Sequence, residues 1–305
     1  MDWIERAGRL KRWTRDDERA PHKPLLMLYA LGRFQQDPDG ALRYSDVERD
    51  LHGLLREYGP PRATTPAYPF HHLANDGVWE VRTDDGGGSP GPKVGALRES
   101  GAAGRLVPEL RDALTREPDL LGQLAHTLLG LHFPPSLHAD LALDAGLDLE
   151  TADAPRGVPR EVRDRRRAAE TRRRVLAAYA YRCAFCGFDG KLGKRPVGLE
   201  AAHVKWWAFR GPDAVANGLC LCALHHRLFD NGALGLGPGP GPERRILVSD
   251  AFGGTGAAAR TQVRELHGRE VAAPEDGSEP VAEPYADWHR REVFKGGGRK
   301  SLTLT

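Results

Sequence analysis

The cysteines constrain the fold of this chain most, because all four lie in one window, between residues 183 and 222, close to several histidines. Cys183 and Cys186 form one short knuckle, and Cys222 and His225 form a second. Together they offer the sulfur and nitrogen donors that a tetrahedral structural zinc requires. The sequence therefore predicts a structural Zn²⁺ held by Cys183, Cys186, Cys222 and His225.

Cys220 is an alternative to Cys222 as a zinc ligand. Its gap to His225 is longer than a knuckle normally uses, so we interpret Cys220 as a small buried hydrophobic residue. A zinc ion with four protein ligands has no open position for water. Any chemistry in this window must therefore come from the residues left over, which are His203, Asn217 and His226.

Three short stretches carry a resemblance to a nuclease family: Leu199 to His203, Asn217-Gly218-Leu219, and Leu221 to His226. In this order and spacing they resemble an HNH endonuclease of the ββα-metal class, in which a base and a divalent cation hydrolyse a phosphodiester bond. The resemblance implies that His203 is the general base and that Asn217 steadies the loop carrying it. It also implies that His226 is a ligand of a catalytic Mg²⁺ or Mn²⁺.

The chain departs from that family at one position. Many members place a second metal ligand immediately before the base, whereas this chain has Ala202 there. If the segment after the second knuckle is helical, Asp230 faces the same side as His226 and is a candidate second ligand of the cation. Asp230 followed by Asn231-Gly232 equally fits a turn that closes the motif.

The main alternative for this window is a zinc ribbon that binds nucleic acid without cutting it. A ribbon needs only the four zinc donors and has no use for His203, Asn217 and His226 at these offsets. The sequence therefore favours a nuclease over a ribbon.

Composition indicates a two-domain intracellular enzyme. The chain has 305 residues, which exceeds a typical single domain, and its cysteine usage fits a metal site in a reducing compartment. No signal-peptide pattern opens the sequence, and no apolar run approaches the length of a membrane span. We expect a cytoplasmic protein without a membrane partner.

Arginines crowd the segment between residues 160 and 174, just before the first knuckle. They could contact a phosphate backbone, or they could form the solvated face of a helix, since Glu161, Asp164 and Glu170 partly offset them. The net charge of the whole chain, +2, does not decide between the two interpretations.

The apolar pattern predicts an α+β protein. Helical spacing covers residues 2–13, 22–34, 47–58, 106–129, 136–143 and 160–180, and Ser45 with Glu48 forms a capping-box pattern. A turn and strand are predicted over 75–81, a strand over 246–248 and a flexible Gly/Pro tract over 235–242. We expect a mainly helical domain with a small sheet or wing in residues 1–145, a linker in 146–160, and the HNH domain in 161–305.

The N-terminal domain carries a second resemblance, in Ala20 to Leu26, Tyr68-Pro69-Phe70 and Asn75 to Trp79. These stretches resemble the sulfur-binding domain of McrA-like type IV restriction enzymes, which recognise phosphorothioate-modified DNA and place such a domain before an HNH nuclease. The segment Trp288 to Phe294 also resembles the C-terminal tail of those enzymes.

A reader of phosphorothioate needs an apolar contact at the sulfur and cations around it, because sulfur keeps the charge but is larger and less hydrated than oxygen. The candidate DNA- and sulfur-binding residues are Arg15, His22, Lys23, Pro24, Tyr68, Pro69, His72 and Lys93. Without the resemblance, His22 to Pro24 would only begin a helix, and Tyr68-Pro69 would only enter a loop.

The sequence thus favours a modification-dependent restriction endonuclease that binds double-stranded phosphorothioate DNA and cuts near the mark. One alternative is an HNH nuclease directed to another mark, such as a methylated base, which would need an aromatic cage or a base-flipping pocket. Another is a zinc-containing DNA-binding protein that does not cut. Because cutting both strands needs two nuclease sites, we also expect a homodimer.

Overall fold

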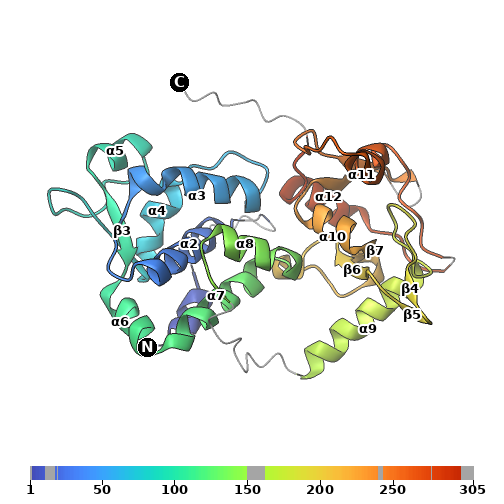
Figure 1. Cartoon of the computed structure of the whole chain (residues 1–305), viewed down its shortest axis with the longest axis horizontal. Helices are drawn as coiled ribbons and strands as arrows, with labels where there is room; N and C mark the ends of the chain where they lie inside the picture. The colour runs from blue at the N-terminus through green and yellow to red at the C-terminus, as the bar shows by residue number, and fades with distance from the viewer. Residues whose placement is uncertain are drawn as a thin grey trace. The chain divides into compact units, whose positions relative to one another are not determined.

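The computed structural model describes residues 2–10, 18, 20–149, 162–239, 243–275 and 277–296, with the backbone alone for 162–169. It forms two compact units, residues 1–158 and 159–305, which run from blue to green and from yellow to red in Figure 1. Each unit combines helices with small antiparallel sheets, so the predicted α+β class is confirmed. Most of the predicted linker, 146–160, lies outside the described residues.

Unit 1 is built around a helix, α2 (His22–Gln36), whose residues from Pro24 to Gly32 are all buried. Its proline lies in the first turn, where the missing N–H group costs no helical hydrogen bond. The helical segments of this unit are α1 (Trp3–Gly8), α2, α3 (Tyr44–Tyr58), α4 (Ala67–His72), η1 (Leu73–Asp76), α5 (Val94–Glu99), α6 (Pro108–Arg116), α7 (Pro118–His132), η2 (Pro135–Leu137) and α8 (His138–Asp144). Three helices, α3, α4 and α7, pack directly against α2.

A three-stranded antiparallel sheet holds α4 in place. Its order is β1 (Leu42–Arg43), β3 (Ala103–Leu106), β2 (Trp79–Arg82), with β3 in the centre. The buried Trp79 of β2 donates a hydrogen bond from Nε1 to the Phe70 carbonyl of α4 at 3.0 Å, and the two rings meet edge to face. The Trp79 ring also lies over Gly104 of β3, where an added Cβ would come within 2.1 Å of Cζ2.

Two sequence predictions in unit 1 are wrong in detail. The capping box at Ser45 does not form, because α3 already begins at Tyr44 and the Ser45 hydroxyl donates to the Asp46 carboxylate. The predicted helical segment 106–129 begins as the end of strand β3 and then divides into α6 and α7. Each of these helices starts with a proline at its first position, which explains both the break and the two starts.

Unit 2 contains a two-stranded hairpin followed directly by a helix. Strand β6 (Leu199–His203) pairs with β7 (Gly218–Cys222) in antiparallel register, His203 opposite Gly218 and Leu199 opposite Cys222. Helix α10 (Ala223–Asp230) continues from the last residue of β7, and α9 (Val162–Ala178) packs against both strands. The remaining elements are β4 (Lys191–Leu192), β5 (Arg195–Pro196), η3 (Trp207–Phe209), η4 (Val215–Asn217), β8 (Leu234–Leu236), β9 (Ile246–Val248), α11 (Ala257–Gln262), η6 (Arg264–Leu266) and α12 (Glu283–Glu292).

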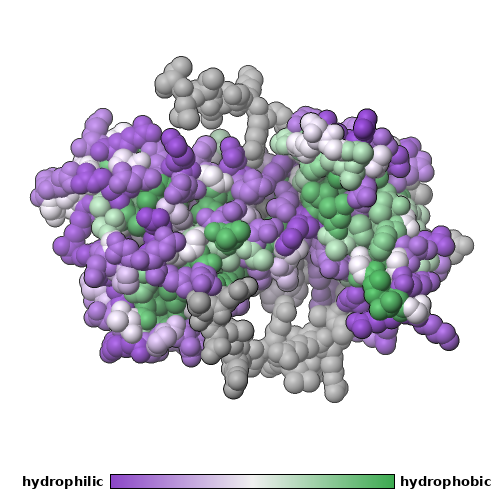
Figure 2. All heavy atoms as spheres, in the orientation of Figure 1, coloured by the Kyte–Doolittle hydropathy of each residue, from purple (hydrophilic) through white to green (hydrophobic). Residues whose placement is uncertain are grey.

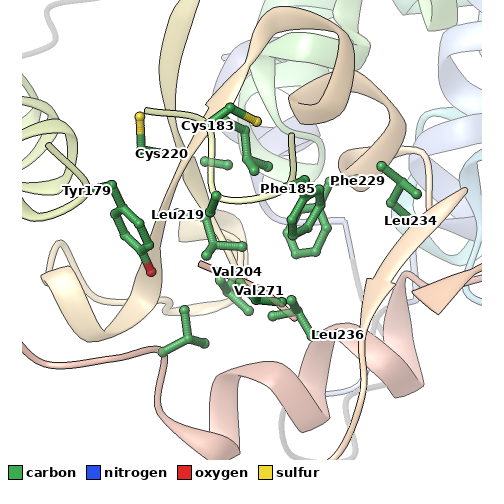
Figure 3. Close-up of a cluster of buried hydrophobic side chains, with 14 of the residues drawn as sticks. Tyr179, Cys183, Phe185, Val204, Leu219, Cys220, Phe229, Leu234, Leu236 and Val271 are labelled. Carbon is green, nitrogen blue, oxygen red and sulfur yellow. The ribbon is translucent and has the colours of Figure 1, made fainter. Parts of the chain in front are cut away.

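One hydrophobic core joins these elements. Figure 3 shows Phe185 and Phe229 side by side, with Leu219 of β7 and Leu234 of β8 around them. Gly235, predicted to begin a flexible tract, lies instead inside β8, so that prediction is wrong at its start. A Cβ at Gly235 would come within 2.5 Å of the Phe294 ring, which explains why this strand position is a glycine.

The segment 288–294 packs against this core. Its His289, on α12, stacks on the Phe229 ring of α10 with ring centroids 3.7 Å apart, and its Nε2 is 3.1 Å from the Phe229 carbonyl oxygen. Figure 2 shows hydrophilic residues over much of the visible face of unit 1, with hydrophobic ones in patches between them, and a broader hydrophobic area on the visible face of unit 2. Among the described helices, none is long and apolar enough to cross a membrane.

The close approach of Trp79 to Gly104 gives a test of the sheet. We expect Gly104→Ala to lower the stability of the protein by about 1–3 kcal/mol, because the added methyl group displaces the Trp79 ring. Gly53, in the middle of α3, has no atom within 4 Å of an added Cβ, so Gly53→Ala is the matched control and should raise stability by up to about 1 kcal/mol. Urea unfolding followed by circular dichroism measures both changes, and equal effects of the two substitutions would contradict the packing described.

Candidate functional site

The structure brings Cys183, Cys186, Cys222 and His225 together. The ligand atoms of the four residues all lie within 4.8 Å of one another. The Cys183 and Cys222 sulfurs are 3.4 and 3.2 Å from Nδ1 of His225. The first two cysteines come from the loop after α9, and the other two residues come from the junction of β7 and α10. The cluster therefore links the loop after α9 to the junction of β7 and α10.

The chemistry of this donor set fits a structural zinc. His225 directs Nδ1 at the sulfurs, while its Nε2 is 2.7 Å from the Gln262 carbonyl oxygen, which fixes the proton on Nε2 and leaves the Nδ1 lone pair for a metal. The hydrogen bond from Cys222 lowers the pKa of Cys183 to about 3, against the opposing effect of burial. A thiolate beside an imidazole lone pair is the state in which these groups bind metal.

Cys220 lies outside the cluster. It is fully buried on β7 in the hydrophobic core, where Figure 3 shows it beside Leu219 and Tyr179. Burial raises the pKa of the Cys220 thiol to about 12, so it stays neutral. The structure thus separates the two neighbouring cysteines that the sequence left as alternatives, since only Cys222 approaches His225.

His203, the predicted base, is the last residue of β6 and is about one-third exposed. Its Nε2 is 2.9 Å from a carboxylate oxygen of Asp213, in the loop that connects β6 to β7. A carboxylate at one ring nitrogen holds the imidazole in one orientation and one tautomer. Nδ1 is then the nitrogen of His203 that can accept a proton from water.

Asn217 holds the same loop from the inside. Its buried amide receives a hydrogen bond from the Lys205 backbone N–H at 2.8 Å and donates to the Lys205 and Pro212 carbonyls at 2.9 and 3.0 Å. These bonds tie Lys205, near His203, to Pro212, next to Asp213. Asn217 therefore holds the backbone between the two members of the His203–Asp213 dyad, and none of its hydrogen bonds among the described residues reaches the His203 side chain.

His226, on α10, lies between two carboxylates. Its Nδ1 is 2.6 Å from Glu200 of β6, and its Nε2 is 3.1 Å from Asp230, one helical turn further along α10. Although burial favours the neutral ring, the negative charges of Asp230 and Glu200 raise the pKa of His226 to about 10. Imidazole nitrogen and carboxylate oxygen are donors that Mn²⁺ and Mg²⁺ accept, so the chemistry of this group fits a divalent cation.

The predicted sulfur-binding residues of unit 1 gather at the start of α2 and on α4. Lys23 is largely buried and forms an ion pair with Asp76 at 2.6 Å, while Nε2 of His22 is 3.0 Å from the Thr64 hydroxyl. The positive charge of Lys23 is thus already partly neutralised by the Asn75-Asp76-Gly77 turn.

Tyr68 and His72 form the aromatic part of this cluster. Their rings are 4.3 Å apart on α4, and the Tyr68 side chain is 37% exposed, which leaves ring surface open to a ligand. Burial, with the nearby His71 and Lys23, lowers the pKa of His72, so this imidazole is neutral at pH 7. The hydrogen bond between Nδ1 of His71 and the Ser89 hydroxyl, 2.7 Å long, ties the glycine-rich loop between β2 and α5 to α4.

Other predicted residues are placed differently. Pro24 and Pro69 are buried within their helices, so their rings offer little surface to DNA. Lys93 is exposed at the residue before α5. Arg15 lies outside the described residues, as do the side chains of Arg160, Arg163, Arg165, Arg166 and Arg167. Arg172 donates a hydrogen bond to the Leu199 carbonyl of β6, which gives it a structural contact in the hairpin.

Sequence reasoning missed Asp213, Glu200 and Asp76 as partners of the predicted site residues. Asp213 and Asp76 lie in loops, and their distances from His203 and Lys23 depend on how those loops close. Glu200 gave a signal that could have been used. In a strand, residues two apart face the same side, so Glu200 shares a face with Ala202, the position at which the family places a metal ligand.

Comparison with solved structures finds several similar chains. The sulfur-binding domain of SprMcrA complexed with phosphorothioated DNA is 25% identical, with a TM-score of 0.41, over 48% of this chain and 93% of that one. The sulfur-binding domain of ScoMcrA complexed with phosphorothioated DNA is 22% identical, with a TM-score of 0.40, over 48% of this chain and 99% of that one. The type IV phosphorothioation-dependent restriction endonuclease ScoMcrA is 21% identical, with a TM-score of 0.39, over 52% of this chain and 31% of that one.

Family models match both halves of the chain. Residues 1–150 match the ScoMcrA-like DNA sulfur-binding domain, and residues 183–237 match an HNH endonuclease. The second match covers the cysteine cluster, both strands of the hairpin and α10. The search of curated proteins finds no match. The chain therefore carries a ScoMcrA-like DNA sulfur-binding domain in residues 1–150 and an HNH endonuclease domain in residues 183–237.

Proposed function

We propose that this protein is a phosphorothioate-dependent DNA endonuclease, in which unit 1 binds the sulfur-bearing backbone and unit 2 hydrolyses a phosphodiester bond near it. The observation that carries the proposal is the presence of both domains in one chain, the second of them with four candidate zinc ligands close together. The solved relatives of the first domain are complexes with phosphorothioated DNA, which supports the same ligand here.

Unit 1 offers the two kinds of contact that a sulfur reader needs. The exposed face of Tyr68, packed on His72, provides an apolar surface for the sulfur. The first turn of α2 carries His22 and Lys23 at the positive end of a 15-residue helix, which favours the negative charge of the remaining phosphate oxygens. We assign the sulfur contact to Tyr68 and His72, and phosphate contacts to His22, Lys23 and the exposed Lys93.

Unit 2 offers a base and a cation site on one hairpin motif. His203 takes a proton from the attacking water at Nδ1, Asp213 holds the ring through Nε2, and Asn217 holds the loop that carries Asp213. His226 would hold a divalent cation, which when bound neutralises charge on the scissile phosphate and the leaving oxygen. The expected products carry 5′-phosphate and 3′-hydroxyl ends.

Cutting both strands needs two such sites, so we also propose that the protein acts as a homodimer on DNA. Sedimentation of the protein with a phosphorothioate duplex measures this, and a strictly one-to-one complex that still cuts both strands would argue against it. We further propose that zinc occupies the cysteine cluster and that Mg²⁺ or Mn²⁺ serves the reaction.

The test of the proposed function is cleavage of paired duplexes that differ only in a phosphorothioate linkage, with Mn²⁺ present. We expect cutting of the sulfur-bearing duplex and binding to it at least fifty-fold tighter than to the oxygen duplex, since about three apolar contacts of ~0.8 kcal/mol each give roughly that preference. Tyr68→Ala should remove most of this preference while the oxygen duplex binds as before. Equal cutting of both duplexes would leave a nuclease without a sulfur reader, and sulfur-selective binding without cutting would leave a reader without a nuclease.

Substitution of the dyad tests the assignment of the base. His203→Ala should lower the single-turnover cleavage rate at least about 100-fold, because a positioned general base contributes roughly that much or more. Asp213→Asn should lower the rate less, about tenfold, since the base remains but its ring is held less firmly. Both variants should bind phosphorothioate DNA and melt like the parent protein. Asp250→Asn, at an exposed turn, is the control. A dyad variant that cuts at the parent rate would show that the base lies elsewhere.

The zinc assignment is tested by comparing two neighbouring cysteines. The purified protein should contain one zinc per chain, measured by mass spectrometry of the metal. Cys222→Ala should lose it and melt at a lower temperature, because binding of a structural metal is part of the folding free energy. Cys220→Ala should keep it, since this thiol faces the core. Loss of zinc from both variants, or from neither, would contradict the ligand set.

A further inference from the structure

His226 has a carboxylate at each of its two ring nitrogens, and this arrangement offers two alternative binding positions for a cation. Glu200 lies 2.6 Å from Nδ1 on one side of the ring, and Asp230 lies 3.1 Å from Nε2 on the other. A neutral imidazole has one lone pair, and its other nitrogen carries a proton. A cation can therefore replace the proton at one nitrogen only, and it can share that side with one of the two carboxylates.

The two binding positions differ in the burial of their carboxylates. The Asp230 side chain is 1% exposed, whereas the Glu200 side chain is 49% exposed. A cation that neutralises charge on a DNA phosphate must touch that phosphate and keep several water ligands. The open side of His226, at Nδ1 and Glu200, meets this requirement, and the closed side, at Nε2 and Asp230, does not.

The strand geometry points to the same side. Glu200 and Ala202 are two residues apart on β6 and so face one side of the hairpin. The contact of Glu200 with His226 identifies that side as the one facing α10. Ala202 is the position before the base, and its methyl group cannot bind a metal. Glu200 has the longer side chain and brings a carboxylate to His226 from the same face, where a ligand at Ala202 is lacking.

Asp230 is placed for a different task. It lies four residues after His226 on α10, so the helix itself fixes its distance from Nε2. Histidines that bind metals generally donate their second ring N–H to a carboxylate or a carbonyl, which sets the tautomer and the ring orientation. Asp230 accepting from Nε2–H would turn the Nδ1 lone pair toward Glu200.

We propose that Glu200 and Nδ1 of His226 together hold the catalytic cation, and that Asp230 is a positioning residue for His226 and not a ligand. This assignment replaces the sequence-based prediction that Asp230 is the second ligand of the cation. It rests on the proposed function of unit 2 as a cation-dependent nuclease, and it explains how that nuclease works with alanine before its base.

Mn²⁺ binding without DNA tests the proposal. We expect titration calorimetry on the full-length, zinc-loaded protein to show at least a tenfold loss of Mn²⁺ affinity in Glu200→Gln. Glu265→Gln, at an exposed position of the same unit, should bind Mn²⁺ like the parent protein. Zinc content and melting temperature of each variant show that the fold is kept. Glu200→Gln with parent affinity would overturn the proposal.

The NMR signals of the two ring nitrogens of His226 give a second test. These signals would not respond to Mg²⁺ in the expected way if Glu200 and Asp230 had only structural roles. During a Mg²⁺ titration of ¹⁵N-labelled protein, with His226→Ala used for assignment, the Nδ1 resonance should shift and Nε2 should keep its proton. In Asp230→Asn the retained Nε2 proton should exchange faster with solvent, because its acceptor is a weaker one. The reverse pattern, with Nε2 shifted and Nδ1–H kept, would place the cation beside Asp230 and overturn the proposal.

The variants also separate this proposal from the proposed function. If His226→Ala loses Mn²⁺ binding while Glu200→Gln keeps it, the nuclease assignment stands and the assignment of Glu200 is wrong. If His226→Ala itself binds Mn²⁺ like the parent protein, the cation site assigned to unit 2 is wrong as well.

Discussion

The meeting of three thiols and one imidazole at the base of the hairpin is the contact on which unit 2 depends. Strands β6 and β7 have five residues each and α10 has eight, lengths at which an isolated hairpin or helix is marginal in water. Cys183 and Cys186 attach the end of α9 to the junction between β7 and α10, where Cys222 and His225 lie. The core behind this junction, with Phe185 and Phe229 in contact, completes the link. Without it, the side chains on β6 and α10 would have no fixed separation.

Within the hairpin motif, the exposure of each side chain matches the role that we assign to it. The groups to which we assign contact with water or with the cation, His203 and Glu200, are one-third to one-half exposed. The groups to which we assign positioning roles, Asn217 for the loop that carries Asp213 and Asp230 for His226, are almost completely buried, where hydrogen bonds are less disturbed by water. Asp213 is about as exposed as His203 and connects the two sets, because it contacts His203 and belongs to the loop that Asn217 closes. Each of the two imidazoles thus has a carboxylate at Nε2, Asp213 for His203 and Asp230 for His226.

What could be predicted from the sequence was set by short distances along the chain. The two knuckles and the order of His203, Asn217 and His226 could be recognised in the sequence because their chemistry requires fixed spacings. The structure brings the four zinc candidates together. The hydrogen-bond and ion-pair partners of these residues could not be predicted from the sequence. Asp213 is ten residues from His203, and Glu200 is 26 residues from His226, so each contact depends on loop closure or on strand and helix packing. The false capping box at Ser45 has the same origin, since the preceding strand β1 lets α3 begin at Tyr44.

The ion pair between Lys23 and Asp76 bears on how sulfur could be told from oxygen. A phosphorothioate carries the same charge as a phosphate, so a free lysine would attract both equally and would add affinity without selectivity. With Lys23 largely buried and paired at 2.6 Å, less of its charge is available to an ordinary phosphate. The neutral His72 beside Tyr68 adds ring surface without adding charge. On a surface with little free positive charge and with exposed aromatic area, the small apolar preference for sulfur is a larger fraction of the total binding free energy. Discrimination between sulfur and oxygen at a charged backbone requires this.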